Sequence, residues 1–68
     1  MSTKAYSGKE CCQLLEKNGW QLKRIKGSHH IYGKPGERAL IVVPVHGNQS
    51  LKPGLQRAIL KLAGLAQQ

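Results

Sequence analysis

Residues 39–45, ALIVVPV, are the most hydrophobic run of the 68-residue chain and decide how it folds. The β-branched side chains of this run favour a strand that is covered on at least one face. Pro44 has no N–H to donate to a neighbouring strand, so the strand should end, bulge or lie at a sheet edge there. Such a strand needs partner strands and a covering layer, and the flanking sequence supplies both.

Two more strands are predicted before this run. Residues 21–26 have an extended, partly apolar pattern, and residues 29–34 carry β-branched and aromatic side chains that are typical of strands. A Gly-Ser pair at 27–28 and a Pro-Gly pair at 35–36 are turn signals that separate the three segments. Because short turns join consecutive strands, we expect them to pair antiparallel.

Helices are predicted on both sides of the three strands. Ser7 and Glu10 match a capping box, in which each side chain satisfies a free backbone N–H at the helix start, and Gly19 is placed to end this helix. In the second helix, Ser50 is expected as the N-cap and Pro53 in the first turn. Its apolar face is formed by Leu55, Ala58, Ile59 and Leu62.

These elements predict an α+β fold of the order helix–strand–strand–strand–helix. We expect a three-stranded antiparallel sheet with both helices on one face, which leaves the other face open to solvent or to a partner. A chain of 68 residues is long enough for one domain only. The domain is therefore expected to span residues 1–68, with its core at about 6–65.

The two cysteines and the absence of targeting patterns bear on the compartment. Cys11 and Cys12 are neighbours, which disfavours a disulfide between them, and we expect one in the core and the other partly exposed. No apolar run reaches the roughly 18 residues of a membrane span, and the N-terminus lacks a signal-peptide pattern. The sequence therefore predicts a cytoplasmic protein that does not enter a membrane.

The charge of the chain is strongly unbalanced. Eleven Lys and Arg stand against three acidic residues, so the formal net charge is +8 and the pI is near 10.0. This excess predicts a polyanionic partner, most often a nucleic acid and otherwise an acidic protein or an anionic lipid.

The segment 26–32, KGSHHIY, places two adjacent histidines next to these cations. On a strand, His29 and His30 point to opposite faces and cannot easily grip one metal ion, and no C-x-x-C or helical H-x-x-x-H motif is present. We therefore expect no metal and no cofactor. If Ile31 faces the core, His29 lies on that same side near the strand end and His30 lies on the open side.

Metal-independent RNA cleavage fits these residue types better than metal chemistry. RNA carries its own nucleophile, the 2′-OH, so a ribonuclease needs a base, an acid and cations for the charge on the phosphorus. Histidine, with an ordinary pKa of roughly 6.5, suits the first two roles, and Lys or Arg suits the third. Lys23, Arg24 and Lys26 lie in the strand expected beside the histidines. The same pattern is also that of ordinary surface histidines, and spacing alone does not separate the two interpretations.

Three segments in this order resemble the HicA (YcfA-like) toxin family of toxin–antitoxin systems. They are LLEKNGW at 14–20, KGSHHIY at 26–32 and VVPVHGNQSLKPGLQRAILKLAGL at 42–65. The resemblance implies a fold like a double-stranded-RNA-binding domain. It also implies a toxin that cleaves mRNA without the ribosome and that a HicB antitoxin neutralises by covering the active site.

The resemblance further implies one catalytic histidine after the Gly-Ser pair. This role falls to His29 first, with His30 as the alternative. The residues expected to contact RNA are Lys23, Arg24, Lys26, Ser28 and Tyr32. With few aromatic residues available for base stacking, low sequence specificity is expected.

Two other functions agree with the same sequence features. A non-catalytic module that binds double-stranded RNA would keep the fold and the charge without histidine chemistry. A protein-interaction module would use the basic face to bind an acidic partner, with weak RNA binding and no cleavage.

Overall fold

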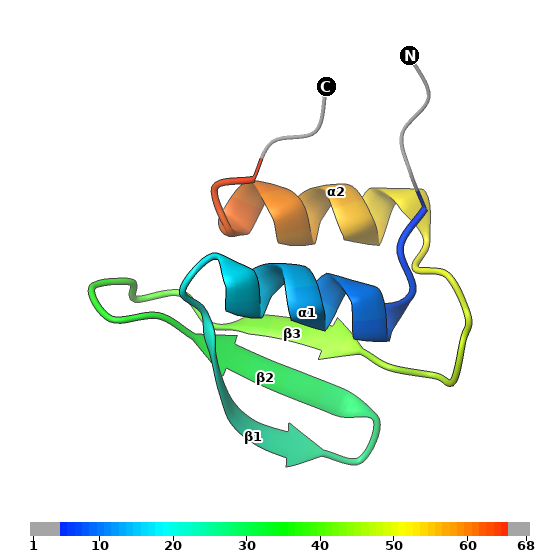
Figure 1. Cartoon of the computed structure of the whole chain (residues 1–68), viewed down its shortest axis with the longest axis horizontal. Helices are drawn as coiled ribbons and strands as arrows, with labels where there is room; N and C mark the ends of the chain where they lie inside the picture. Colours follow the sequence, from blue (N-terminus) through cyan, green and yellow to red (C-terminus); the bar gives the residue numbers. More distant parts are fainter. Residues whose placement is uncertain (1–4, 66–68) are drawn as a thin grey trace.

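The computed structural model describes residues 5–65 and has the predicted order of elements. Along the chain these are α1 (Gly8–Lys17), β1 (Gln21–Lys26), β2 (His29–Gly33), β3 (Ile41–Pro44) and α2 (Pro53–Leu62). The strands form one antiparallel sheet in the order β1-β2-β3, and both helices lie on one side of it (Figure 1). The α+β fold predicted from the sequence is confirmed, including the open face of the sheet.

Strand β3 is an edge strand that ends at Pro44, as the proline predicts. It is shorter than the hydrophobic run that contains it, because residues 39–40 precede the pairing with β2. Backbone pairing continues one step beyond the strand, where the Val45 N–H donates to the Ser28 carbonyl at 2.8 Å.

The helix signals at the two ends of α1 are both confirmed. The Ser7 N–H donates to Glu10 Oε1 at 2.9 Å, and the Glu10 N–H donates to Ser7 Oγ at 3.1 Å, which completes the capping box. After the last turn, Gly19 adopts a φ of 91°, a left-handed conformation that glycine takes without strain. The Trp20 N–H then donates to the Leu15 carbonyl at 3.0 Å, and the indole packs in the core.

The predicted N-cap of α2 is wrong by two residues. Ser50 instead forms an isolated β-bridge with Ser7, and Lys52 is the N-cap, without a side-chain hydrogen bond. The reason is Pro53, which occupies the first helical position and restricts the residue before it to an extended conformation. Lys52 has φ −63° and ψ 141°, as this restriction requires.

The core lies between the sheet and the two helices, and Tyr32 is its sheet-side centre. Tyr32 is 1% exposed, and its directly paired neighbour Ile41 is fully buried. The Tyr32 hydroxyl donates to Glu16 Oε2 on α1 at 2.6 Å, so the ring points toward the helices. The other members of the core cluster are Cys11, Cys12, Leu15, Trp20, Val43, Leu51, Ile59 and Ala63.

The predicted direction of Ile31 is therefore wrong, and so are the directions of the two histidines derived from it. Since neighbouring strand residues point to opposite faces, Tyr32 and His30 face the helices, while Ile31 and His29 face the open side. Ile31 is nevertheless only 8% exposed, because its paired neighbours Arg24 and Val42 flank it on that face. Because Ile31 and Tyr32 are neighbours and both largely apolar, the sequence does not indicate which of the two faces the helices.

The two cysteines are free and both buried, so the expectation of one partly exposed cysteine is wrong. They belong to the face of α1 that packs on the sheet, where Cys12 comes close to the Tyr32 hydroxyl. Burial raises the pKa of the Cys11 thiol to about 11, and the neighbouring Cys12 adds to the shift. Burial also raises the pKa of the Cys12 thiol, the nearby Tyr32 hydroxyl lowers this pKa in part, and the Glu16 carboxylate raises it.

The raised thiol pKa predicts a loss of stability in alkaline solution. The unfolded chain ionises Cys11 near its ordinary pKa of 9.0, whereas the folded chain keeps the proton up to about pH 11. The contribution of the buried Cys11 thiol to the free energy of unfolding is fully present below pH 9. It is lost as the pH rises toward the folded pKa, because thiolate formation then favours the unfolded chain. Urea unfolding at a series of pH values should show this loss, and a Cys11→Ala variant should show a shallower one. An equal pH dependence in both proteins would contradict the assignment.

Candidate functional site

A β-bulge in β1 gathers three cations on the open face of the sheet. The pairing register shifts between Leu22 and Arg24, so Lys23 and Arg24 together oppose Ile31 of β2. In a regular strand, Lys23 and Arg24 would point to opposite faces. Here Arg24 is paired with the open-face residue Ile31, and the Lys23 side chain lies over Gly33, another open-face position.

His29 lies on the same face as these cations. It is the first residue of β2, it is exposed, and it is paired with Lys26 on β1 and with Pro44 on β3. Directly paired residues of antiparallel strands share a face, with Cα atoms about 4.5–5.5 Å apart. The imidazole is therefore accessible to solvent and has the Lys26 ammonium group on its own side of the sheet.

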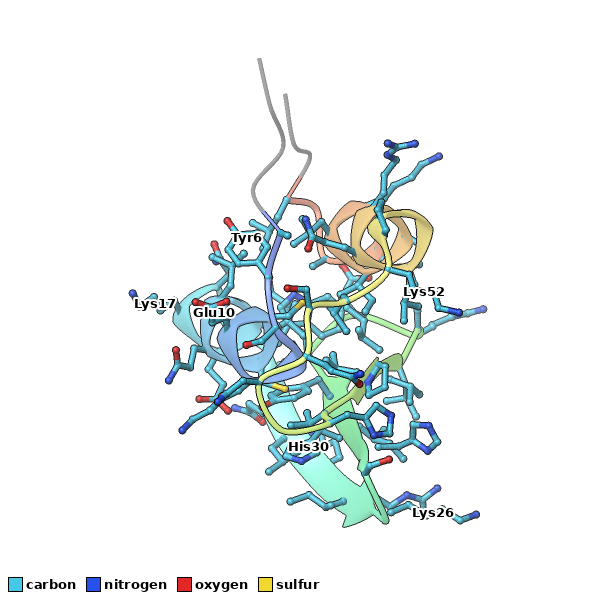
Figure 2. All side chains as sticks on the ribbon, turned by 90° about the vertical axis from the view of Figure 1, so that its right-hand side faces the viewer. Tyr6, Glu10, Lys17, Lys26, His30 and Lys52 are labelled. Atoms are coloured by element: carbon cyan, nitrogen blue, oxygen red, sulfur yellow. The ribbon has the colours of Figure 1, made fainter. Side chains whose placement is uncertain are left out.

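His30 lies on the opposite side, in a different environment. It lines a cavity of about 330 Å³ between α1 and the sheet, together with Glu16, Cys12 and Tyr32. Figure 2 shows His30 on the side of the sheet that carries α1, whereas Lys26 extends to the other side. The adjacent histidines are therefore separated by the sheet itself.

Tyr32 does not take the RNA-contacting role expected of it. Its ring is buried in the core and its hydroxyl is bonded to Glu16, so no ring face is left for a base to stack on. Burial raises the pKa of the Tyr32 hydroxyl, and the bond to Glu16 raises it further. The phenol therefore stays protonated and packed against α1, away from the open face.

Of the predicted site residues, four lie together and one lies beside them. Lys23, Arg24, Lys26 and His29 share the open face. Ser28 is half-buried in the turn before β2, where its carbonyl accepts the hydrogen bond from Val45. The structure thus brings four of the predicted residues together, through a bulge that the sequence did not predict.

The centre of the open face is apolar. Ile31 is flanked by Val42, which is 45% exposed, and the Leu40 side chain approaches Gly33 from the same side. A surface with an apolar centre and a cationic rim can bind a macromolecule through both shape and charge.

A second hollow, which the sequence did not predict, lies at the end of β3. It has a volume of about 280 Å³ and is lined by Pro44, His46, Lys52 and neighbouring residues of the loop that leads into α2. The signal was present in the sequence, because His46 and Lys52 flank a polar loop. The position of this hollow next to His29 depends on the pairing of His29 with Pro44, which the sequence alone does not give.

Residues 5–65 contain no group of three or more His, Cys, Asp or Glu side chains that could hold a metal ion. Within the same part of the chain, neither helix is long and apolar enough to cross a membrane.

A family model described as "HicA toxin of bacterial toxin-antitoxin" matches residues 8–65, which is most of the chain and includes both helices and all three strands. Among curated proteins, none matches the chain.

Proposed function

Because the chain belongs to the HicA toxin family of bacterial toxin–antitoxin systems, we propose that it is an endoribonuclease that cleaves mRNA and so stops translation. His29 is the catalytic residue, and neither a metal nor the ribosome takes part. The observation that carries this proposal is the bulge in β1, which puts Lys23 and Arg24 on the same face as Lys26 and His29.

The chemistry of these groups fits a transesterification within RNA. His29 takes the proton of the 2′-OH, the 2′-oxygen attacks the phosphorus, and the bond from phosphorus to the 5′-oxygen breaks. The leaving oxygen takes up a proton, so the products are a 2′,3′-cyclic phosphate and a 5′-OH. Lys26, paired with His29, stabilises the charge that develops on the phosphate oxygens. Arg24 and Lys23 hold the adjoining backbone.

The alternative assignment to His30 has weaker support. His30 is half-buried between α1 and the sheet, and its cavity is lined by the Glu16 carboxylate as well as by Lys9, so it lacks the positive charge that the cations give the open face. An RNA strand would also lose contact with the three cations of the other face. We therefore assign catalysis to His29.

We propose that a HicB-type antitoxin neutralises the protein by covering the open face. Acidic groups of the antitoxin would pair with the cationic rim, and apolar groups would cover Ile31, Val42 and Leu40. RNA and antitoxin would then compete for one surface. We further propose that the protein acts in the cytoplasm, where mRNA is translated.

The first test is RNA cleavage by the purified protein with excess EDTA. We expect cleavage to continue, the products to carry 2′,3′-cyclic phosphate and 5′-OH ends, and RNA affinity to fall steeply with salt as counterions are released. Linear 3′-phosphate ends formed directly, or activity that disappears with EDTA, would contradict the mechanism. RNA binding without any cleavage would instead favour the non-catalytic module that binds double-stranded RNA.

A further inference from the structure

The cavity at the end of β3 combines apolar walls with a polar rim. Pro44, Leu51 and Leu55 supply the apolar surface, and Leu51 also anchors the loop because it belongs to the core. His46 and Lys52 lie at the rim, both exposed to solvent. The loop between β3 and α2 therefore forms a small, accessible hollow with a cation at its edge.

The cavity lies next to the proposed catalytic histidine, because one residue of its lining is paired with His29. Pro44 lines the cavity and is also the direct partner of His29 across the β2–β3 pair. The bond from the Val45 N–H to the Ser28 carbonyl continues this pairing into the loop, so the loop keeps a fixed position relative to His29. An RNA segment held at His29 thus has the cavity on its β3 side and Lys26 on its β1 side.

Figure 2 agrees with this arrangement. Lys26 and Lys52 extend toward the same side of the molecule, away from α1. His29 is paired with Lys26 on one flank and with the cavity residue Pro44 on the other. The cations and the cavity together outline a path that crosses three strands.

The size and lining of the cavity fit one nucleotide. Its volume of about 280 Å³ is just below the usual range of ligand sites, so it suits one base and not a base pair. A base can lie against the apolar walls, while His46 and Lys52 reach the attached phosphate. The three acidic residues of the chain, at positions 10, 16 and 37, are all outside the lining.

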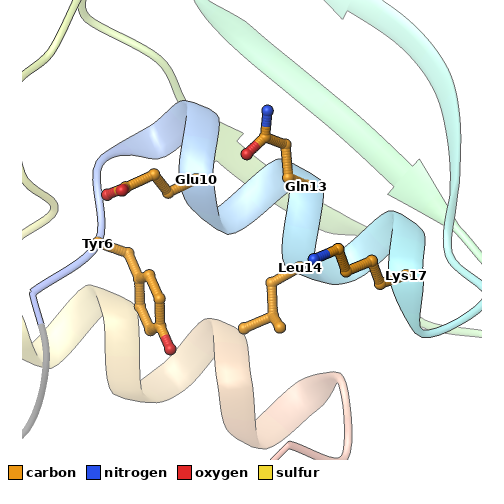
Figure 3. Close-up of a pocket in the computed structure, with 5 residues that line it drawn as sticks. All are labelled: Tyr6, Glu10, Gln13, Leu14 and Lys17. Atoms are coloured by element: carbon orange, nitrogen blue, oxygen red, sulfur yellow. The ribbon is translucent and has the colours of Figure 1, made fainter.

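Two other cavities lined by residues 5–65 do not offer this combination. The cavity around His30 contains the Glu16 carboxylate and is separated from the cations of the open face by the sheet. The cleft of about 180 Å³ between Tyr6 and Lys17 contains Glu10 and lies on the side of the molecule away from Lys26 and Lys52 (Figures 2 and 3). Each of these two linings pairs one carboxylate with one lysine, Lys9 or Lys17, so neither offers a polyanion the carboxylate-free cationic rim of the cavity at the end of β3.

We propose that the cavity at the end of β3 binds the unpaired nucleotide next to the scissile phosphate, so that the toxin selects single-stranded RNA. The inference rests on the proposed function, because the scissile phosphate is placed at His29. A base in the cavity must leave any duplex, so a paired segment has to open before it is cut. His46 and Lys52 are then substrate-binding residues, and cleavage depends on them through RNA affinity.

The test compares two variants that each remove one positive charge, one at the start and one at the end of α2. Lys52→Gln removes a cation from the rim, and Lys61→Gln removes an exposed cation from the last turn of α2, outside the lining. His46→Gln removes the second rim group. We expect KM for a single-stranded oligonucleotide to rise about tenfold in Lys52→Gln and His46→Gln, as for a lost charge-assisted hydrogen bond, with kcat changed less than about threefold. Lys61→Gln should leave both values near those of the unchanged protein.

A second measurement separates the cavity from catalysis. A 2′-O-methyl oligonucleotide lacks the attacking hydroxyl, so its binding can be followed by fluorescence anisotropy without cleavage. We expect Lys52→Gln to weaken this single strand about tenfold and to weaken a 2′-O-methyl duplex no more than Lys61→Gln does. Equal effects of Lys52→Gln and Lys61→Gln on the single strand, or equal losses for single strand and duplex, would overturn the inference. Selective weakening of the single strand in a protein that cuts no RNA would support the cavity and reject the proposed function.

Discussion

Replacing His29 by glutamine is expected to lower the rate of RNA cleavage by about a hundredfold to ten-thousandfold, which is the usual contribution of a general base. Glutamine keeps the approximate size and polarity of the side chain but cannot take the 2′-OH proton. His29 is exposed at the first position of β2, so the change should leave folding intact. Single-turnover cleavage of one labelled oligonucleotide gives the rate, and 2′-O-methyl RNA gives the affinity, which should change little.

His30→Gln is the matched comparison, because it makes the same substitution one residue along the same strand. It alters the cavity under α1 and leaves the open face as it was. We expect its cleavage rate to stay within a few-fold of that of the unchanged protein. The reverse result, with loss in His30→Gln alone, would move the catalytic site to the side of Glu16 and Tyr32. Full cleavage activity in both variants would show that neither His29 nor His30 is the catalytic residue.

Gly8→Ala is expected to lower the free energy of unfolding by about 3 kcal/mol, near the upper end for an overpacked site. A Cβ at Gly8 would lie 2.2 Å from the Pro44 carbonyl oxygen and 2.9 Å from Val45 Cα. Both are backbone atoms and cannot rotate away, so α1 and β3 would have to separate. The gain in helix propensity from alanine, about 1 kcal/mol, is too small to compensate. Thermal unfolding should show a Tm lower by more than about 10 °C.

Gly54→Ala provides the control for that experiment. Gly54 is in the first turn of α2, and a Cβ there would meet no atom within 4 Å. The same substitution should therefore raise stability by about 0.5–1 kcal/mol through helix propensity alone. Equal stability of Gly8→Ala and the unchanged protein would show that the helix does not approach β3 as closely as described.

The fold was predictable because its signals are local. The capping box at Ser7 and Glu10, the left-handed Gly19 and the proline at position 44 each act within a few residues, and all three behave as expected. Ser50 shows the limit of the same reasoning, since it is a good capping residue whose place is taken because Pro53 fixes the helix start two residues later.

The candidate site was predictable in composition but not in geometry. The cations and histidines were identified from the sequence, whereas their faces depend on which of Ile31 and Tyr32 points inward. Both side chains are buried, so hydrophobicity does not distinguish them. Tyr32 points inward, where its hydroxyl donates a hydrogen bond to the Glu16 carboxylate, a residue 16 positions away in the chain. The bulge at Lys23 likewise arises from pairing with β2 and leaves no signature within β1 itself.

The bulge has an effect on self-association as well. Strand β1 is an edge, and an edge strand with a free row of N–H and C=O groups can recruit a second copy of the chain and begin aggregation. The extra residue twists β1 locally, and the clustered like charges repel an identical strand. At the other edge, β3 is only four residues long and ends in a proline, which offers little to an incoming strand. Although one face of the sheet is not covered by a helix, both edges of the sheet are thus protected against pairing with a strand of another copy.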